Sequence, residues 1–209
     1  CLAALAAALF LKGRNEPIHD PSRITYVILG TSLLWFGWFG FNAGSALSAN
    51  SLAVQAFVNT TVASAAAAIG WGFIEKIRGK KISAMGVCIG AVVGLVAITP
   101  AAGFVTAAHS VVIGLVDVFP CHGVGGIVGM ILTGVFANPA VNSAVTEPGL
   151  FFGETSLFFK HLVALVGVTA FAFVGSYILL YVTNLITPLR VREEYETQGL
   201  DITQHGEHL

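Results

Sequence analysis

Charged side chains are scarce in this sequence. Only 10% of its 209 residues are Asp, Glu, Lys or Arg, whereas soluble domains carry roughly 25%. Four long stretches hold no charge at all: residues 24–74, 82–116, 118–146 and 161–189. A soluble protein of this length needs a polar surface, so the scarcity excludes a soluble domain and indicates an integral membrane protein.

Other scarcities exclude further classes. The net charge is −1, which gives no electrostatic basis for a nucleic-acid partner. Cys1, Cys88 and Cys121 lie far apart and lack any metal or redox spacing. His205 and His208 in the polar tail are only a pair, too few ligands for a structural zinc site. We therefore expect no metal, no cofactor and no nucleic acid.

The uncharged stretches predict helices rather than strands. A helix needs about 20 apolar residues to cross a bilayer, whereas a membrane barrel shows alternating segments of about 10 residues. Here the runs are apolar on every side and rich in Ala, Gly and Leu. The fold class is therefore an all-α polytopic transmembrane bundle, in which the 24 glycines indicate close helix packing. The predicted spans are 1–11 (partial), 24–48, 52–75, 82–99, 101–116, 118–137 and 157–187.

Lysine and arginine mark one side of the membrane. They gather at 12–23, at 76–81 and after residue 189, and cytoplasmic connectors accumulate these residues. We therefore predict a transmembrane domain over 1–187 and a cytoplasmic tail over 188–209, in a multi-pass protein of the cell (inner) membrane. Among the basic residues, Lys160 is the exception to this asymmetry.

One connector is missing from the alternation of spans. The span over 101–116 runs inward and the span over 118–137 runs outward, so a cytoplasmic connector is required between them. The sequence offers only Gly114 to Asp117, without a basic residue. We predict that residues are missing between Gly114 and Leu115, either unresolved or deleted, and a continuous backbone there would contradict a break.

Polar groups inside a membrane are costly, so each demands a reason. In the run GWFGFNAGS, Trp38, Phe41 and Ser45 follow the spacing i, i+3, i+7 and share one helix face, which Leu34 extends by a turn. A cation such as ammonium can sit over aromatic rings and bond to a hydroxyl. The alternative is a packed aromatic stripe without a binding role.

Asp117 and His122 are the second candidate pair, near the start of an apolar span. A neutral imidazole donates and accepts protons and titrates near neutrality, so His122 suits a proton relay in a pore. A hydrogen-bonded core histidine is the alternative. The remaining polar residues of the spans are assigned to packing between helices: Asn42, Gln55, Asn59, Thr60, Thr61, His109 and Asn184.

Several of these runs, taken in order, resemble one family. They are LLWFGWFGFNAGSA at 33–46, FVNT at 57–60, GLVAITPA at 94–101 and HGVGGIVG at 122–129, followed by GLD at 199–201 and HGE at 205–207. The sequence is similar along its whole length to the ammonium transporters, the Amt branch of the Amt/Rh/methylammonium permease family. The resemblance implies an eleven-helix fold of two inverted halves, of which this chain holds the end of helix five through helix eleven.

The resemblance also implies residue roles. Phe41 is similar to one of two stacked phenylalanines that gate the outer end of the pore, and Ser45 to the hydroxyl of the outer ammonium site. Trp38 and Leu34 resemble pore lining below the gate. His122 resembles one of two paired mid-pore histidines, whose partner would precede Cys1. Asp117 resembles the acidic residue at the start of helix ten, with a structural role.

The function implied by the resemblance is transport of ammonium or ammonia through a hydrophobic pore. A homotrimer in membrane lipid is the implied assembly, with a PII-type signalling protein or signalling domain at the cytoplasmic face. An ammonium sensor, a transporter-like module coupled to a signalling domain, is the alternative. A membrane enzyme using His122 and Asp117 is disfavoured, because the sequence has no nucleophile motif or metal cluster.

Overall fold

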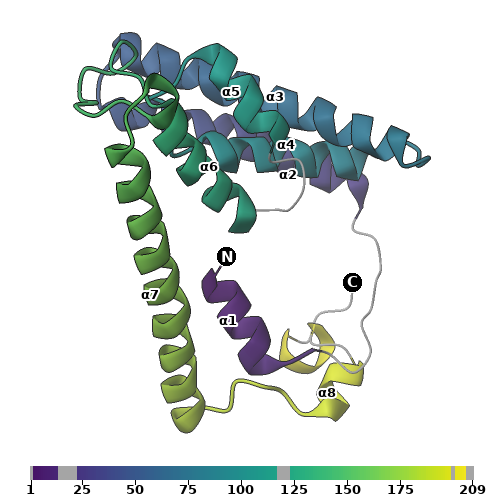
Figure 1. Ribbon diagram of the computed structural model, residues 1–209. Coiled ribbons are helices and arrows are strands. Elements are labelled where there is room, and N and C mark those ends of the chain that lie inside the picture. Colours follow the sequence, from purple (N-terminus) through teal and green to yellow (C-terminus); the bar gives the residue numbers. More distant parts are fainter. Residues whose placement is uncertain (1, 14–22, 117–122, 199–200, 206–209) are drawn as a thin grey trace. The chain divides into compact units, whose positions relative to one another are not determined.

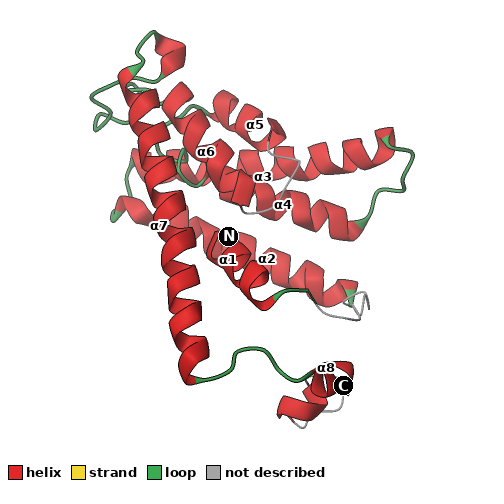
Figure 2. Ribbon diagram, turned by 60° about the horizontal axis from the view of Figure 1, so that its bottom comes forward, coloured by secondary structure: helices red, strands yellow, loops and turns green. Residues whose placement is uncertain are grey.

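The structure is a computed structural model that describes residues 2–13, 23–116, 123–198 and 201–205 (Figure 1). No strand occurs among the described residues (Figure 2), so the predicted all-α class is confirmed. The chain divides into two compact units, one formed by 1–20 with 166–209 and the other by 21–165. The helices are α1 (Leu2–Leu11), α2 (Ile24–Asn42), α3 (Ser51–Ile77), α4 (Ala84–Ile98), α5 (Ala107–Val116), α6 (Gly123–Phe136), α7 (Ser156–Ile186) and α8 (Glu193–Gln198). Short 3-10 turns lie at η1 (Gly44–Ala46) and η2 (Leu150–Phe152), and a π turn lies at η3 (Asp201–His205).

The helices fall where the uncharged stretches predict them. Three helical segments are long and apolar enough to cross a membrane: Ile24–Ala46, Ser51–Ile77 and Ser156–Ile186. α1, α4, α5 and α6 are shorter apolar helices. Two predicted spans are shortened. α2 stops at Asn42 and Leu47 takes a left-handed conformation with φ 55°, and the span over 101–116 becomes helical only at Ala107.

α3 and α4 form the most closely packed pair of the larger unit (Figures 1 and 2). Gly86, Gly90 and Gly94 recur every four residues along α4. A methyl group added to Gly90 would stand 2.8 Å from the carbonyl oxygen of Ala67, and one added to Gly94 would stand 2.6 Å from that of Ala63. The predicted close packing through glycine is therefore confirmed for this pair.

Buried polar side chains tie the helices of this unit together. The Asn59 amide donates to the carbonyl oxygens of Ala102 (2.8 Å) and Val105 (2.7 Å), and Gln55 donates to the same Val105 oxygen (3.2 Å). Asn42 on α2 donates to the Thr60 hydroxyl on α3 at 3.0 Å. The predicted packing role is confirmed for these four polar side chains, whereas Thr61 bonds back to its own helix, to the Phe57 oxygen.

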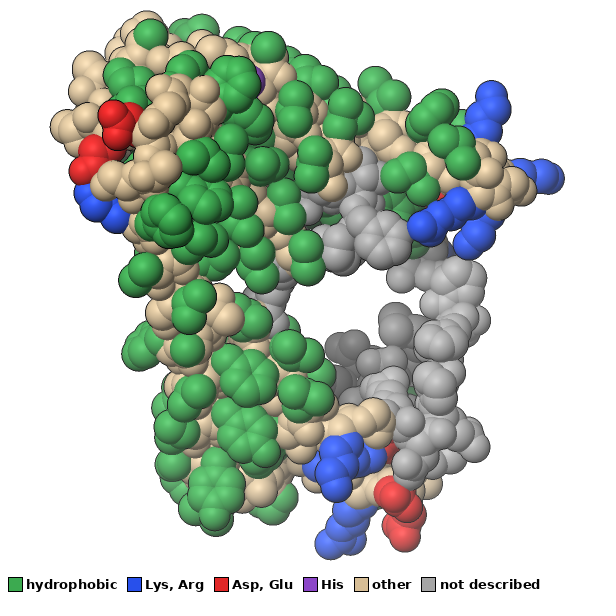
Figure 3. Space-filling view, viewed as in Figure 1, with side chains coloured by type: hydrophobic (Ala, Val, Ile, Leu, Met, Phe, Trp, Pro, Cys, Tyr) green, Lys and Arg blue, Asp and Glu red, His purple; other side chains and the backbone are tan. Residues whose placement is uncertain are grey.

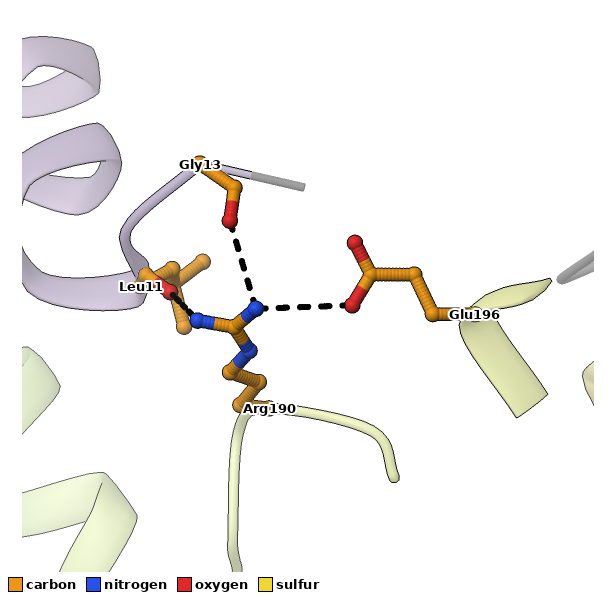
Figure 4. Close-up of polar contacts among 4 residues, drawn as sticks. All are labelled: Leu11, Gly13, Arg190 and Glu196. Atoms are coloured by element: carbon orange, nitrogen blue, oxygen red, sulfur yellow. Dashed lines mark hydrogen bonds and ion pairs between the residues drawn. The ribbon is translucent and has the colours of Figure 1, made fainter. Parts of the chain in front are cut away.

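The smaller unit joins the first connector to the tail. Arg190 donates to the carbonyl oxygens of Leu11 (3.0 Å) and Gly13 (3.2 Å), and it also forms an ion pair with Glu196 at 3.5 Å (Figure 4). Phe10 packs edge-on against Tyr177, with ring centroids 5.4 Å apart. The carbonyls at the end of α1 thereby receive donors that a helix end otherwise lacks.

α5 contains the bond at which residues are predicted to be missing. It runs over Ala107–Val116 without interruption, so the backbone is continuous between Gly114 and Leu115. This continuity excludes a gap in the structure, and a deletion relative to longer proteins stays a prediction.

Candidate functional site

The end of α2 brings Phe41 and Ser45 together. α2 ends at Asn42 and the chain continues as the tighter turn η1, which contains Ser45. The Ser45 hydroxyl donates to the carbonyl oxygen of Phe41 at 2.6 Å, and this bond satisfies one of the open carbonyls of a helix end. The two predicted residues are thus neighbours, although Ser45 lies beyond the helix whose spacing predicted them.

A pocket of about 190 Å³ opens beside this turn. It lies between the end of α2, the first turns of α3 and the segment that follows α4. Polar atoms come from Asn42, Ser45, Thr99 and Asn142, and Phe41 and Phe104 supply aromatic surface. No residue that lines it, within the described part of the chain, carries a charge. A cation here would therefore meet ring faces and neutral oxygens rather than a carboxylate.

Trp38 lies one turn before the pocket and is fixed from two sides. Its indole Nε1 donates to the Thr99 hydroxyl at 2.8 Å, and that hydroxyl donates in turn to the Leu95 carbonyl at 2.7 Å. The ring also stands edge-on to Phe41, with centroids 5.7 Å apart. The predicted face of Trp38 and Phe41 is therefore a physical contact, and Thr99 links it to the pocket wall.

Asn42 both lines the pocket and bonds to α3. Its side chain is 8% exposed, it lines the pocket, and its amide donates to the Thr60 hydroxyl. A buried amide without a partner costs free energy, so this bond holds Asn42 in place at the pocket edge. The sequence assigned Asn42 to packing, which is correct but incomplete.

The other predicted site residues lie apart from this pocket. Leu34 is 42% exposed on α2 and does not line the pocket. Asp117 and His122 lie outside the described residues, and α6 begins at Gly123, directly after His122. Sequence reasoning missed Thr99 and Asn142, because both come from segments far from residues 38–45 and no local spacing links them to it.

A larger cavity of about 400 Å³ lies at the same end of the unit, between the segment after α4 and the start of α7. Its charged residues, Glu147 and Lys160, are paired with each other at 2.5 Å. The His161 Nδ1 atom lies 2.9 Å from the Met130 carbonyl oxygen. These contacts engage Lys160, the Oε1 atom of Glu147 and the His161 ring, and they explain how Lys160, the exception among the basic residues, is tolerated there. The Glu147 Oε2 atom is buried without a hydrogen-bond partner among the described residues.

His109 on α5 packs against aromatic rings. Its imidazole stacks on Phe136, with centroids 4.5 Å apart, and stands edge-on to Phe151 at 5.4 Å. Its Nδ1 atom has no hydrogen-bond partner among the described residues. The packing role predicted for His109 is confirmed by these contacts.

Comparison with known proteins agrees with this description. The model of the Ammonium Transporter Family matches residues 1–117 and 115–209. An ammonium transporter of Bacillus subtilis is 42% identical over 229 residues, covering 99% of this chain and 56% of that protein. The crystal structure of Candida albicans Mep2 superimposes with a TM-score of 0.83 at 32% identity, covering 92% of this chain and 50% of that one. A structure titled Sensor Amt Protein gives a TM-score of 0.81 at 25% identity, covering 97% of this chain and 56% of that one.

Two details of these matches bear on the chain itself. It spans about half the length of the curated relatives that it matches. The match to the Bacillus protein runs over 229 residues, more than the 209 residues of this sequence. The alignment therefore contains positions at which this chain has no residue, and the two family-model matches meet at residues 115–117.

Proposed function

Because this chain belongs to the ammonium transporter family, we propose that it forms one half of a membrane pathway for ammonium. The observation that carries the proposal is the pocket beside Phe41 and Ser45, with Trp38 fixed below it. In this pathway ammonium is collected at the pocket, over the aromatic rings and against the Ser45 hydroxyl. The uncharged lining supports this role, because a carboxylate would retain the cation instead of releasing it.

The selectivity problem is to pass ammonium while rejecting potassium, a cation of similar size. A bare charge is expensive in a dry apolar pore. Ammonium escapes this cost by giving up its proton, which potassium cannot do. We propose that the proton leaves at the outer pocket and that neutral ammonia then passes Leu34 and His122.

His122 is proposed as one member of a mid-pore histidine pair that hydrogen-bonds ammonia and relays a proton. Its partner would come from the half of the pathway that this chain does not cover. Asp117 is proposed as a structural acid beside it. The complete assembly is proposed as a homotrimer in the cell (inner) membrane, with a cytoplasmic tail that a PII-type protein could contact, and without enzymatic activity.

The short helix α5 supports a further part of the proposal. Its ten residues extend about 15 Å, half of a hydrocarbon core of about 30 Å. We propose that the inner end of this span and the cytoplasmic connector that should follow it are absent from this chain between Gly114 and Leu115. Sequencing the gene and its transcript across these codons tests this, and relatives without extra residues at this position would refute it.

The Ser45 hydroxyl offers the sharpest test of the transport proposal. In liposomes containing the full-length protein, Ser45→Ala should raise the half-saturating ammonium concentration several-fold, because a neutral acceptor at the pocket is lost. Ser48→Ala is the matched control, since Ser48 is an exposed hydroxyl just after the same turn that does not line the pocket. Equal effects of the two substitutions would remove the support for a site at Ser45.

The mid-pore role has its own experiment. His122→Asp should weaken discrimination against potassium in the same liposomes, because a fixed negative charge lowers the cost of a bare cation. Unchanged selectivity would refute the role of His122 while leaving the outer pocket untouched.

A sensor is the second candidate function. It is favoured by the likeness to the structure titled Sensor Amt Protein. In this case the same pocket would bind ammonium and the tail would transmit the signal to a further domain. Ammonium binding without measurable flux by the full-length protein would support the sensor over the transporter.

A further inference from the structure

The larger cavity beside α7 holds hydrogen-bond acceptors that the proposed transport steps do not use. Its volume of about 400 Å³ lies within the ~300–1,000 Å³ range of ligand sites. Glu147 reaches it from the loop before α7, and Lys160 and His161 reach it from the first two turns of α7. Figure 3 shows acidic and basic side chains next to each other at the end of the larger unit where α7 begins, beside hydrophobic surface.

His161 brings an acceptor to this cavity. Its Nδ1 atom lies 2.9 Å from the Met130 carbonyl oxygen, and a carbonyl oxygen only accepts, so Nδ1 carries the proton. In a neutral imidazole the other nitrogen, Nε2, is then an acceptor. Gly134 permits this close approach of α6 to α7, because a methyl group added to it would stand 3.2 Å from the Phe158 Cα atom and 3.4 Å from the His161 Cβ atom.

The carboxylate of Glu147 has one engaged oxygen and one open oxygen. The Lys160 Nζ atom pairs with Oε1 at 2.5 Å, whereas Oε2 is buried and has no hydrogen-bond partner among the described residues. A buried acceptor without a donor costs free energy. A ligand that donates N–H bonds would satisfy this oxygen, and the contact with Lys160 shows that an ammonium group fits against the carboxylate.

This cavity adjoins the pocket of Ser45. Phe104 lines both, and the loop after α6 contributes Asn142 to the pocket and residues 144–147 to the cavity. The two differ in charge, because the described lining of the pocket is uncharged whereas a carboxylate and an ammonium group line the cavity. Since Lys160 already neutralises part of that carboxylate, a second cation would be held weakly enough to move on.

We propose that this cavity is a second ammonium site, in which Glu147 Oε2 and His161 Nε2 accept N–H bonds and Lys160 is a tethered competitor. The inference rests on the proposed ammonium pathway and adds a loading site beside the Ser45 pocket. Ammonium suits two acceptors because it donates in four directions, whereas potassium donates no hydrogen bond. Lysine has a flexible four-carbon stem and the Lys160 side chain is 62% exposed, so its ammonium group can yield the carboxylate to an arriving cation.

Thermal unfolding of the full-length protein in detergent tests this inference, because a ligand that binds the folded state raises the unfolding midpoint. The rise is measured in ammonium chloride against sodium chloride of equal ionic strength, in a Ser45→Ala background that weakens the neighbouring pocket. Glu147→Gln should raise the half-saturating ammonium concentration at least fivefold, because the charge and its open oxygen are lost. Glu154→Gln, the matched control in the loop before α7, should leave this concentration unchanged.

Lys160→Gln should act in the opposite direction and lower the half-saturating concentration at least threefold, since the carboxylate loses its competitor. A folding defect cannot produce tighter binding. Lys76→Gln, which removes the same charge from the last turn of α3, should have no effect.

The proposal would be overturned by an absent ammonium response in the Ser45→Ala background, by equal responses of the Glu147 and Glu154 variants, or by unchanged or weaker binding in Lys160→Gln. An equal rise in potassium chloride would also overturn it. These measurements do not involve flux. An unaltered flux in Ser45→Ala would instead refute the transport role of the Ser45 pocket, so the two failures are distinguishable.

Discussion

α2 and α3 are both long apolar helices of one unit, yet they are covered very differently. α3 buries eight residues against its neighbours, including Asn59, Ser64 and Ala67. α2 buries only Asn42, and Leu33 and Phe36 on it are 63% and 76% exposed. α3 thus finds its packing partners within this chain, and α2 finds few of them.

The difference explains why the candidate site lies where it does. Asn42 and Trp38 reach from α2 to Thr60 and Thr99 on the packed pair α3–α4. The opposite side of α2, with Leu33 and Phe36, remains open. A pathway between two halves of a transporter requires a helix that packs against its own half on one side and is exposed on the other. The exposed side of α2, with Leu33 and Phe36, is therefore a boundary of this chain.

Gly94 on α4 gives the largest expected effect. Gly94→Leu should destabilise the full-length protein by about 3 kcal/mol, because overpacking a close helix contact costs about this much and the added side chain would meet Ala63 and Ser64 backbone. Gly30→Leu on α2 should be close to neutral, since nothing lies within 4 Å of its added methyl group. Thermal unfolding in detergent measures both.

The same pair of variants also tests whether α2 is less closely covered than α3 in the full-length protein. If Gly30→Leu in the full-length protein costs as much as Gly94→Leu, then another part of the assembly covers α2 as tightly as α4 covers α3. Such a result would make the exposed side of α2 a packed interface rather than an open surface.

Asn59 on α3 gives an intermediate effect. Asn59→Ala removes the donors to the buried carbonyls of Ala102 and Val105, and a loss of about 1–2 kcal/mol follows, as for polar contacts between membrane helices. Ser32→Ala on α2 is the control, because its hydroxyl only bonds back to Ile28 on an exposed surface. Thermal unfolding of the two variants should therefore separate clearly, and equal midpoints would contradict the comparison.

The contrast between α2 and α3 also shows what the sequence could predict. The predicted spans overlap the helices, because the apolar interior of the bilayer excludes charged residues from the runs and cytoplasmic connectors accumulate Lys and Arg. The end of α2 was predicted too late, since the turn at Gly44 and the left-handed Leu47 lie in an equally apolar run. Thr99 and Asn142 reach the pocket only through tertiary packing, which helical spacing around residues 38–45 does not contain.

The ion pair of Glu147 with Lys160 should have the smallest effect, because both side chains are partly exposed and exposed pairs contribute little. Its hydrogen bonds to Lys160 and then to Ser156 lower the pKa of the Glu147 carboxyl. A lowered pKa in the folded state means that the contribution is present above the pKa of an ordinary glutamate and is lost as the pH falls through the folded value. Glu147→Gln should therefore lower the melting temperature slightly at neutral pH, and this difference from the unmodified protein should vanish in acid. Glu154→Gln, in the same loop, is the control, because Glu154 forms no ion pair among the described residues, and a difference that grew toward acid pH would contradict the assigned pair.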